Sequence, residues 1–312
     1  MAGMNIAAYR DWAIERYRDI NDPPTLKSRF DISFGESFVG KTYTITNGTY
    51  TYTGTVPEEL KVEVEVAGLE TRYTISIDSF IKTIDIGAYC INAKISIGEY
   101  ATNNLIFYYD AINNTGNGHD DSATTWADLS GNDNNGAISD GEWENNALIF
   151  NGSSTYVNCG IKNFTNVSVE AYIEYGIVPS SEVGIACNFE YGGYGLDAKN
   201  SKTTFVAYVG EYKYVYCKEN IVVGEPVHII GTYDGIDVKL FINGVLNNII
   251  NAPGAIGEAQ NSTIFALGGD PIGENVKGGW FKGKIKSFRL YDRALTEDEV
   301  YNNYIYELKR YS

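Results

Sequence analysis

Between Arg29 and Ile97 the chain alternates apolar and polar residues with a period of two, and this pattern constrains the fold more than any other feature. Segments such as KTYTIT and LKVEVEV place their apolar side chains on one face of a strand. Turn signals such as Asn47-Gly48 separate them. About seven such strands in roughly 70 residues predict a small antiparallel β-sandwich, assigned to residues 25–98.

A short amphipathic helix is predicted before this sandwich. Its apolar residues fall three or four positions apart, at Ile6, Tyr9, Ala13, Tyr17 and Ile20. Asp22-Pro23-Pro24 ends the helix, so residues 1–24 are predicted to be a helix and linker. Docking of the helix on its own domain and association with other copies of itself both stay open.

A second all-β domain is predicted for residues 105–312, after a polar linker at residues 99–104. Its alternating segments are long enough for two facing sheets, and the dipeptides Asp234-Gly235 and Asn243-Gly244 are strong hairpin signals. The sequence therefore predicts a jelly roll.

The chain is predicted to end in a helix. Thr296 and Glu299 have the spacing of a capping box. Val300, Tyr304 and Leu308 lie four apart, which indicates one apolar stripe packed on the sandwich.

Five segments of the second domain, taken in order, resemble the laminin-G-like branch of the concanavalin A-like lectin/glucanase superfamily. They are DLSGNDNNG, IFNGSSTYV, VEAYIEY, HIIGTYDGIDVKLFINGV and FKGKIKSFRLYDRALTEDEV. The resemblance implies a jelly roll of the kind used to bind surface carbohydrate. The whole fold is thus expected to be all-β, a small antiparallel sandwich followed by a larger concanavalin A-like sandwich, with short N-terminal and C-terminal helices.

The N-terminal stretch FGESFVGKTYTITNGTYTYTGTVPEEL resembles immunoglobulin-like or carboxypeptidase-regulatory-like domains of phage and prophage tail proteins. The resemblance implies a non-enzymatic, virion-associated tail protein that binds a host-surface glycan, contacts other tail or virion proteins, and forms trimers by analogy. One alternative is a purely structural decoration or assembly module that binds protein and not sugar. A bacterial surface adhesin is disfavoured because no export signal is recognised.

Charge and composition limit the partners. The formal net charge of −16 repels nucleic acid and anionic lipid. We find neither a signal peptide nor a run long enough to span a bilayer, so we expect synthesis in the bacterial cytoplasm without membrane insertion. Four widely spaced cysteines, Cys90, Cys159, Cys187 and Cys217, suggest neither a zinc site nor a redox motif and are interpreted as reduced and buried.

Hydrolysis is disfavoured. Glucanases of the superfamily resemble one another in a strand bearing Glu-x-Asp followed by a second Glu, whereas here Tyr172 stands between Glu170 and Glu174. We interpret the two glutamates as solvent-facing. His228 is interpreted as a structural histidine in a strand and His119 as part of a solvated acidic loop.

A sugar site requires aromatic faces beside carboxylate or amide groups on loops. The candidate carbohydrate-binding residues are Tyr191, Tyr194, Trp143, Asp270 and Asn275, and for each an ordinary structural role is the alternative.

Calcium is the predicted cofactor, because it binds carboxylate, amide and carbonyl oxygens and several laminin-G-like modules bind it. Asp128 with Asn132, joined by Asp292, are the candidate ligands, and a bare acidic turn is the alternative. An anionic ligand would need bound cations or a basic patch such as Lys282, Lys284 and Lys286.

Overall fold

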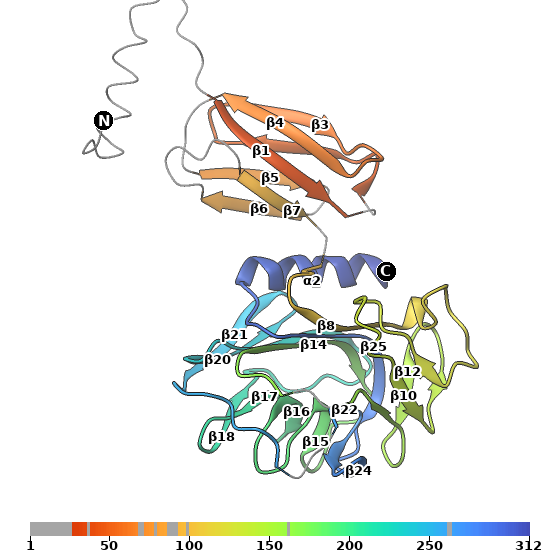
Figure 1. The fold of residues 1–312 in the computed structure, drawn as a ribbon. Helices are drawn as coiled ribbons and strands as arrows, with labels where there is room; N and C mark the ends of the chain where they lie inside the picture. Colours follow the sequence, from red (N-terminus) through yellow and green to blue (C-terminus); the bar gives the residue numbers. More distant parts are fainter. Residues whose placement is uncertain are drawn as a thin grey trace, which may run out of the picture. The chain divides into compact units, whose positions relative to one another are not determined.

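The structure, a computed structural model, describes residues 27–35, 38–67, 72–77, 80–85, 93–97, 100–160, 163–260 and 264–312. The chain divides into two units, with the boundary between Glu99 and Tyr100. The helix predicted between Asn5 and Ile20 lies outside the described residues. Within them the regular secondary structure is almost entirely β-strand, as predicted (Figure 1).

The first unit contains two facing sheets, with strand orders β4-β1-β7 and β3-β2-β5-β6. Alternate residues point inward, and the rings of Phe30 and Tyr73 meet at 4.9 Å between centroids. Among the described strands of this unit every pair is antiparallel except β1 with β7, which run parallel. The strands are β1 (Lys27–Phe34), β2 (Thr42–Thr46), β3 (Thr51–Thr55), β4 (Lys61–Ala67), β5 (Arg72–Ile77), β6 (Phe80–Asp85) and β7 (Ala93–Ile97).

The second unit is a sandwich of two large antiparallel sheets. One has the order β18-β17-β16-β15-β22-β13-β10-β9, the other β11-β12-β25-β14-β19-β20-β21, with β8 also paired to β25. A two-stranded ribbon, β23-β24, completes the described sheets. The strands of the first sheet are β9 (Thr125–Trp126), β10 (Gly136–Ser139), β13 (Tyr156–Asn158), β15 (Val183–Cys187), β16 (Tyr194–Lys199), β17 (Lys202–Tyr208), β18 (Tyr212–Tyr216) and β22 (Ala266–Leu267). The remaining elements are β8 (Leu105–Asp110), the 3-10 helix η2 (Ala111–Asn113), β11 (Glu142–Trp143), β12 (Leu148–Asn151), β14 (Val167–Tyr175), β19 (Pro226–Tyr233), β20 (Asp237–Ile242), β21 (Val245–Asn251), β23 (Asp270–Ile272), β24 (Asn275–Gly278), β25 (Lys282–Tyr291) and the helix α2 (Glu297–Arg310).

Both predicted hairpins are present. Asp234-Gly235 lies in the turn between β19 and β20, and Asn243-Gly244 joins β20 to β21. Asn243 and Gly244 have φ of 49° and 78°, the left-handed values that a two-residue hairpin turn needs.

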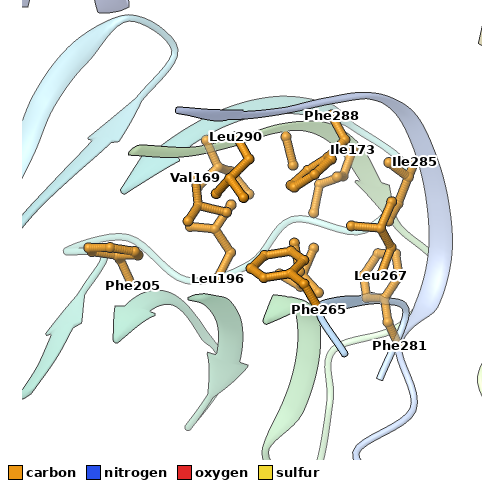
Figure 2. Packing of buried hydrophobic residues seen from close by; sticks show 14 of the residues in the cluster. Val169, Ile173, Leu196, Phe205, Phe265, Leu267, Phe281, Ile285, Phe288 and Leu290 are labelled. Atoms are coloured by element: carbon orange, nitrogen blue, oxygen red, sulfur yellow. The ribbon is translucent and has the colours of Figure 1, made fainter. Parts of the chain in front are cut away.

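The core lies between the two sheets (Figure 2). Val169 and Ile173 of β14 and Leu290 of β25 face Leu196 and Phe265 from the opposite sheet. The sheets approach closely at Gly231 of β19, where an added Cβ would lie 2.1 Å from the ring of Phe205. A larger side chain there would push the layers apart.

Residues from the predicted linker belong to the second unit. The N–H of Ala101 donates to Asn303 Oδ1 at 2.8 Å, and Arg293 Nε donates to the carbonyl of Asn103 at 2.9 Å. The chain is therefore bound to the C-terminal helix and its approach loop before β8 begins.

The predicted capping box of α2 is present, since Thr296 and Glu299 each bond the other's backbone N–H. The predicted packing stripe is wrong at its end, because Leu308 is 44% exposed. Val300 is buried as predicted, but beside it the helix buries the polar Asn303 and Glu307. The physical reason is that Glu307 pairs with a buried arginine, Arg289, and Asn303 donates to the buried Glu170.

That arginine is the centre of a charged cluster buried under α2. Arg289 of β25 lies 2.7 Å from Glu170 of β14 and 2.5 Å from Glu307 of α2. None of the three residues has exposed surface. His228 Nε2 lies 2.9 Å from Glu170 Oε1, and Asn303 Nδ2 donates to Glu170 Oε2 at 2.6 Å. The interpretation of Glu170 as solvent-facing is therefore wrong, because the helix covers that face of the sheet.

Arg289 outweighs the effect of burial on the pKa of Glu170 but not on that of Glu307. Burial alone would raise the pKa of Glu170, but Arg289 and the hydrogen bonds outweigh it and lower that pKa. Burial raises the pKa of Glu307. The guanidinium carbon of Arg289 also lies 4.1 Å from the ring centroid of Tyr108 and 4.7 Å from that of Tyr100.

Cys159, Cys187 and Cys217 are buried and form no disulfide, as predicted, whereas Cys90 lies outside the described residues. In the described part of the chain, no helix has the length and apolar character needed to cross a membrane.

Arg289→Ala is expected to destabilise the second unit by about 3–5 kcal/mol, because it leaves Glu170 and Glu307 as unpaired buried charges. Urea unfolding followed by tryptophan fluorescence measures the loss, since Trp126 and Trp143 are buried in this unit. Lys213→Ala, which breaks the exposed pair with Glu211, is the control and should change little. Equal, small losses in both variants would contradict the role given to Arg289.

Candidate functional site

A pocket of about 340 Å³ opens on the outer side of the sheet that contains β15 to β18. In Figure 1 these strands lie in the layer away from α2. We call it the acidic-aromatic pocket, because its lining combines carboxylates with aromatic rings. The lining residues are Glu182, Gly184, Phe189, Glu190, Tyr191, Asp197, Tyr212, Tyr214, Asp270 and Gly279.

The edge strand β18 supplies a row of tyrosines. In YKYVY, residues two apart share a face, so Tyr212, Tyr214 and Tyr216 lie on one side while Val215 is buried in the core. The Tyr214 and Tyr216 rings stack with centroids 5.9 Å apart, and Phe189 meets Tyr212 edge-on at 6.0 Å. This row was not among the predicted site residues, although its period-two spacing is a readable signal.

The loop before β16 presents Tyr191. Glu190, Tyr191 and Gly193 have φ of 147°, 53° and 82°, an unusual left-handed run. Gly192 lies against the loop between β21 and β22. An added Cβ would lie 2.0 Å from the carbonyl oxygen of Glu258 in that loop. The Tyr191 side chain is left 66% exposed at the pocket. Such a strained, tightly packed loop is typical of functional positions.

Two aspartates in the pocket are in an unfavourable setting for a charge. Asp197 of β16 has no exposed surface, so water does not solvate its carboxyl group. Burial, and then the hydrogen bond and charge of Glu182, raise the pKa of Asp197 well above its ordinary value. Burial and the charges of Glu190 and Glu182 raise the pKa of Asp270 to about 7.

Glu182 is in the opposite situation. Its carboxylate lies 2.8 Å from Lys199 Nζ and accepts a hydrogen bond from the Tyr214 hydroxyl at 2.9 Å. Burial would raise the pKa of Glu182, but its hydrogen bonds outweigh burial and lower it. Burial and the bond to Glu182 in turn raise the pKa of Tyr214 to about 12.

Two of the predicted sugar-binding residues, Tyr191 and Asp270, line this pocket, and three do not. Tyr194 is fully buried with its ring 5.9 Å from Phe265. It lies three positions before Asp197, an odd offset that puts it on the opposite face of β16. Trp143 is also in the core, with its Nε1 donating to the carbonyl of Ala123 at 2.9 Å. Asn275 is exposed on β24, opposite Ile272 of β23.

The predicted calcium ligands form part of a hydrogen-bonded turn. The carboxylate of Asp128 accepts from the backbone of Tyr108, Ser130 and Asn134. The amide of Asn132 donates to the carbonyl of Leu105 at 2.8 Å.

The third predicted ligand, Asp292, directly follows β25. The backbone N–H of Asp292 donates to Asn104. Among the described residues, no group of three or more His, Cys, Asp or Glu side chains is arranged to hold a metal ion. Calcium binding at Asp128 stays a prediction.

The candidate basic patch lies elsewhere. Lys282, Lys284 and Lys286 are on β25, which belongs to the other sheet. The acidic-aromatic pocket has no lysine or arginine among its lining residues.

Asp270→Asn is expected to stabilise the second unit at about pH 8 and to have little effect near pH 4. The folded state holds a proton on Asp270 up to about pH 7, whereas the ordinary pKa is 3.8, so stability falls as pH rises through that window. Asparagine cannot ionise, so the variant does not lose stability as the pH rises through this window. Thermal unfolding at both pH values tests it, with Glu225→Gln at an exposed carboxylate as control. A gain that does not depend on pH would contradict the assignment.

Comparison with known proteins agrees with the architecture of the second unit. Residues 151–301 match a family described as the Concanavalin A-like lectin/glucanases superfamily. No curated protein sequence matches the chain.

Many solved structures are similar to the second unit, three of which follow. The receptor-binding domain of a botulinum neurotoxin C/D mosaic serotype has a TM-score of 0.51 and 16% identity, over 65% of this chain and 51% of its own. A mutant Trypanosoma rangeli sialidase displaying trans-sialidase activity has a TM-score of 0.50 and 13% identity, over 66% and 33%. Domain 4 of AbnA, a GH43 extracellular arabinanase from Geobacillus stearothermophilus, has a TM-score of 0.48 and 20% identity, over 64% and 97%.

The chain thus covers about half of the toxin domain and a third of the sialidase. At these identities the likeness establishes the fold alone. Together with the family match, it shows that the second unit is a jelly-roll domain with the concanavalin A-like fold of lectins and glucanases.

Proposed function

We propose that this protein is a non-catalytic carbohydrate-binding protein and that the acidic-aromatic pocket is its glycan site. The observation that carries the proposal is the exposed ring of Tyr191 beside Tyr212, Tyr214 and four carboxyl side chains around one hollow. Aromatic rings cover the C–H face of a sugar, and carboxylates accept hydrogen bonds from its hydroxyls. A module that only binds protein would instead be expected to present a broad apolar patch.

The biological setting in the proposal is a phage or prophage tail. The support is the resemblance of the N-terminal stretch to domains of tail proteins and the presence of a lectin-like fold after it. In this setting the first unit attaches to other tail or virion proteins, and the second contacts the host-surface glycan. A trimer fits the same analogy.

One observation favours a second candidate function, glycoside hydrolysis. Within the pocket the pKa values of the carboxyls are split, since that of Asp270 is raised to about 7 and that of Glu182 is lowered. A split of this kind is what a general acid and its carboxylate partner need. Against it, Glu170, on the strand where glucanases carry their pair, is buried and bonded to Arg289.

The first test is binding of the full chain to a microbial glycan array, with calcium and with chelator. Tyr191→Ala and Tyr212→Ala should each weaken the selected glycan by about tenfold, because each removes an aromatic anchor. Tyr194→Phe, at a buried ring outside the hollow, should leave binding unchanged. If the folded chain binds no glycan in either condition, the assembly module becomes the better interpretation.

The second test separates binding from hydrolysis. The bound glycan is incubated with the protein, and new reducing ends are measured. We expect none to form. Release of reducing ends that Asp270→Asn abolishes, with glycan binding retained, would instead identify Asp270 as a catalytic acid.

A further inference from the structure

One edge of the first unit lacks the features that normally keep sheet edges apart. Strand β3 stands at the end of the sheet order β3-β2-β5-β6, so among the described strands it pairs with β2 alone. No charged residue occurs between Thr42 and Val56, and the register of β3 with β2 is continuous, without a bulge. Charged side chains, proline and bulges are the usual means of preventing edge-to-edge pairing. Strand β3 has none of them.

The other described edges of this unit carry charged side chains. Strand β4 has Lys61, Glu63 and Glu65, β7 has Lys94, and β6 has Lys82. The chain as a whole has a formal net charge of −16, so two copies repel each other over most of their surface. At β3 they can meet without placing charges opposite one another.

The backbone groups of β3 point alternately toward β2 and away from it. The N–H of Asn47 donates to the carbonyl of Tyr50 at 3.2 Å, which shows that the even-numbered position bonds toward β2. Because the two directions alternate along an antiparallel strand, odd-numbered residues turn their N–H and C=O groups out of the sheet. These outward residues are Thr51, Thr53 and Thr55, and all three are exposed.

We propose that β3 pairs in antiparallel register with β3 of a second copy of this chain, around a two-fold axis at Thr53. The contact is isologous, because both copies use the same edge. Thr53 then lies opposite Thr53 of the second copy, and Thr51 lies opposite Thr55 of the second copy. Every outward N–H and C=O group of the three threonines thereby gains a partner. The inference does not depend on the proposed glycan-binding function.

The same register fits the side chains. It places Tyr52 opposite Gly54 of the second copy. Gly54 lies against Tyr43 of β2, since an added Cβ would lie 2.6 Å from Tyr43 Oη. Tyr52 is on the same face, with its ring centroid 6.1 Å from that of Tyr43, and it is 37% exposed. An aromatic ring across from an edge glycine covers the backbone that the glycine leaves bare.

The contact is small, because one five-residue strand from each copy takes part. Interfaces below about 1,200 Å² are typical of weak and transient complexes. We therefore expect a reversible dimer with a Kd between about 10 µM and about 1 mM. A two-fold contact gives a dimer and not the trimer suggested by analogy, so the mass of the assembly distinguishes the two.

The test is sedimentation equilibrium of the full chain over that concentration range, where the average mass should rise toward that of two chains. Thr53→Lys should weaken the association by at least about tenfold, because it places two like charges directly opposite each other at the axis. The side chain is exposed in the single copy, so the fold should tolerate the change. Thr83→Lys, at an exposed position on β6 at the other end of the same sheet, is the matched control and should have no effect.

A cysteine at the axis tests the register itself. Residues opposite each other in a hydrogen-bonded antiparallel pair have Cα atoms about 5.5 Å apart, which is within the range of a disulfide. Mild oxidation should therefore convert Thr53→Cys into covalent dimers. The parent chain and Thr83→Cys should form none.

Three results of the mass measurement would overturn the inference. They are a single chain at all concentrations, a trimer, or a dimer that Thr53→Lys leaves intact. Equal cross-linking of the two cysteine variants would also overturn it. Thermal melting shows whether each variant is folded, and if Thr53→Lys is not, the cross-linking of Thr53→Cys decides.

Discussion

The second unit depends on the ion pairs that Arg289 makes with Glu170 and Glu307. Taking these charges out of water costs several kcal/mol per ion, and the cost is met only while all three remain together with their hydrogen-bonding neighbours. Because the three residues come from β25, β14 and α2, the pairing fixes the C-terminal helix on the centre of one sheet. The cluster therefore specifies where the helix docks more than it adds stability.

Because α2 docks on one sheet only, the two outer faces of the sandwich have different roles. The outer face of the β14 and β25 sheet is closed by α2, and its polar residues are used for structure. The outer face of the other sheet holds the pocket, where Tyr191 is exposed and Asp270 Oδ1 has no hydrogen-bond partner. A polar group that the fold leaves unsatisfied is available to a ligand.

Much of the fold could be predicted from the sequence, because alternation, turn dipeptides and capping boxes are local signals. The hairpin at Asn243-Gly244 and the start of α2 at Thr296 are examples. The burial of Glu170 and Glu307 could not be predicted in this way. It depends on an arginine that lies more than a hundred residues away from Glu170 along the chain. A local pattern treats such glutamates as solvent-facing.

The site was predicted only in part, for a related reason. Its residues come from the segment before β15, the loop before β16, β16 itself, β18 and the start of β23, which only the sheet order brings together. Tyr191 and Asp270 were found because loop aromatics and carboxylates are plausible sugar ligands. Tyr194 was wrongly predicted to bind sugar. It lies an odd number of positions from Asp197 on β16, so its side chain points into the core.

The central claim is that glycan occupies this pocket and no other surface of the second unit. The most direct measurement is a titration of ring-labelled tyrosine protein with the glycan it selects, followed by NMR. The account predicts that the resonances of Tyr191, Tyr212 and Tyr214 shift, while those of the buried Tyr194 and Tyr233 do not. Shifts confined to tyrosines outside the pocket would contradict it.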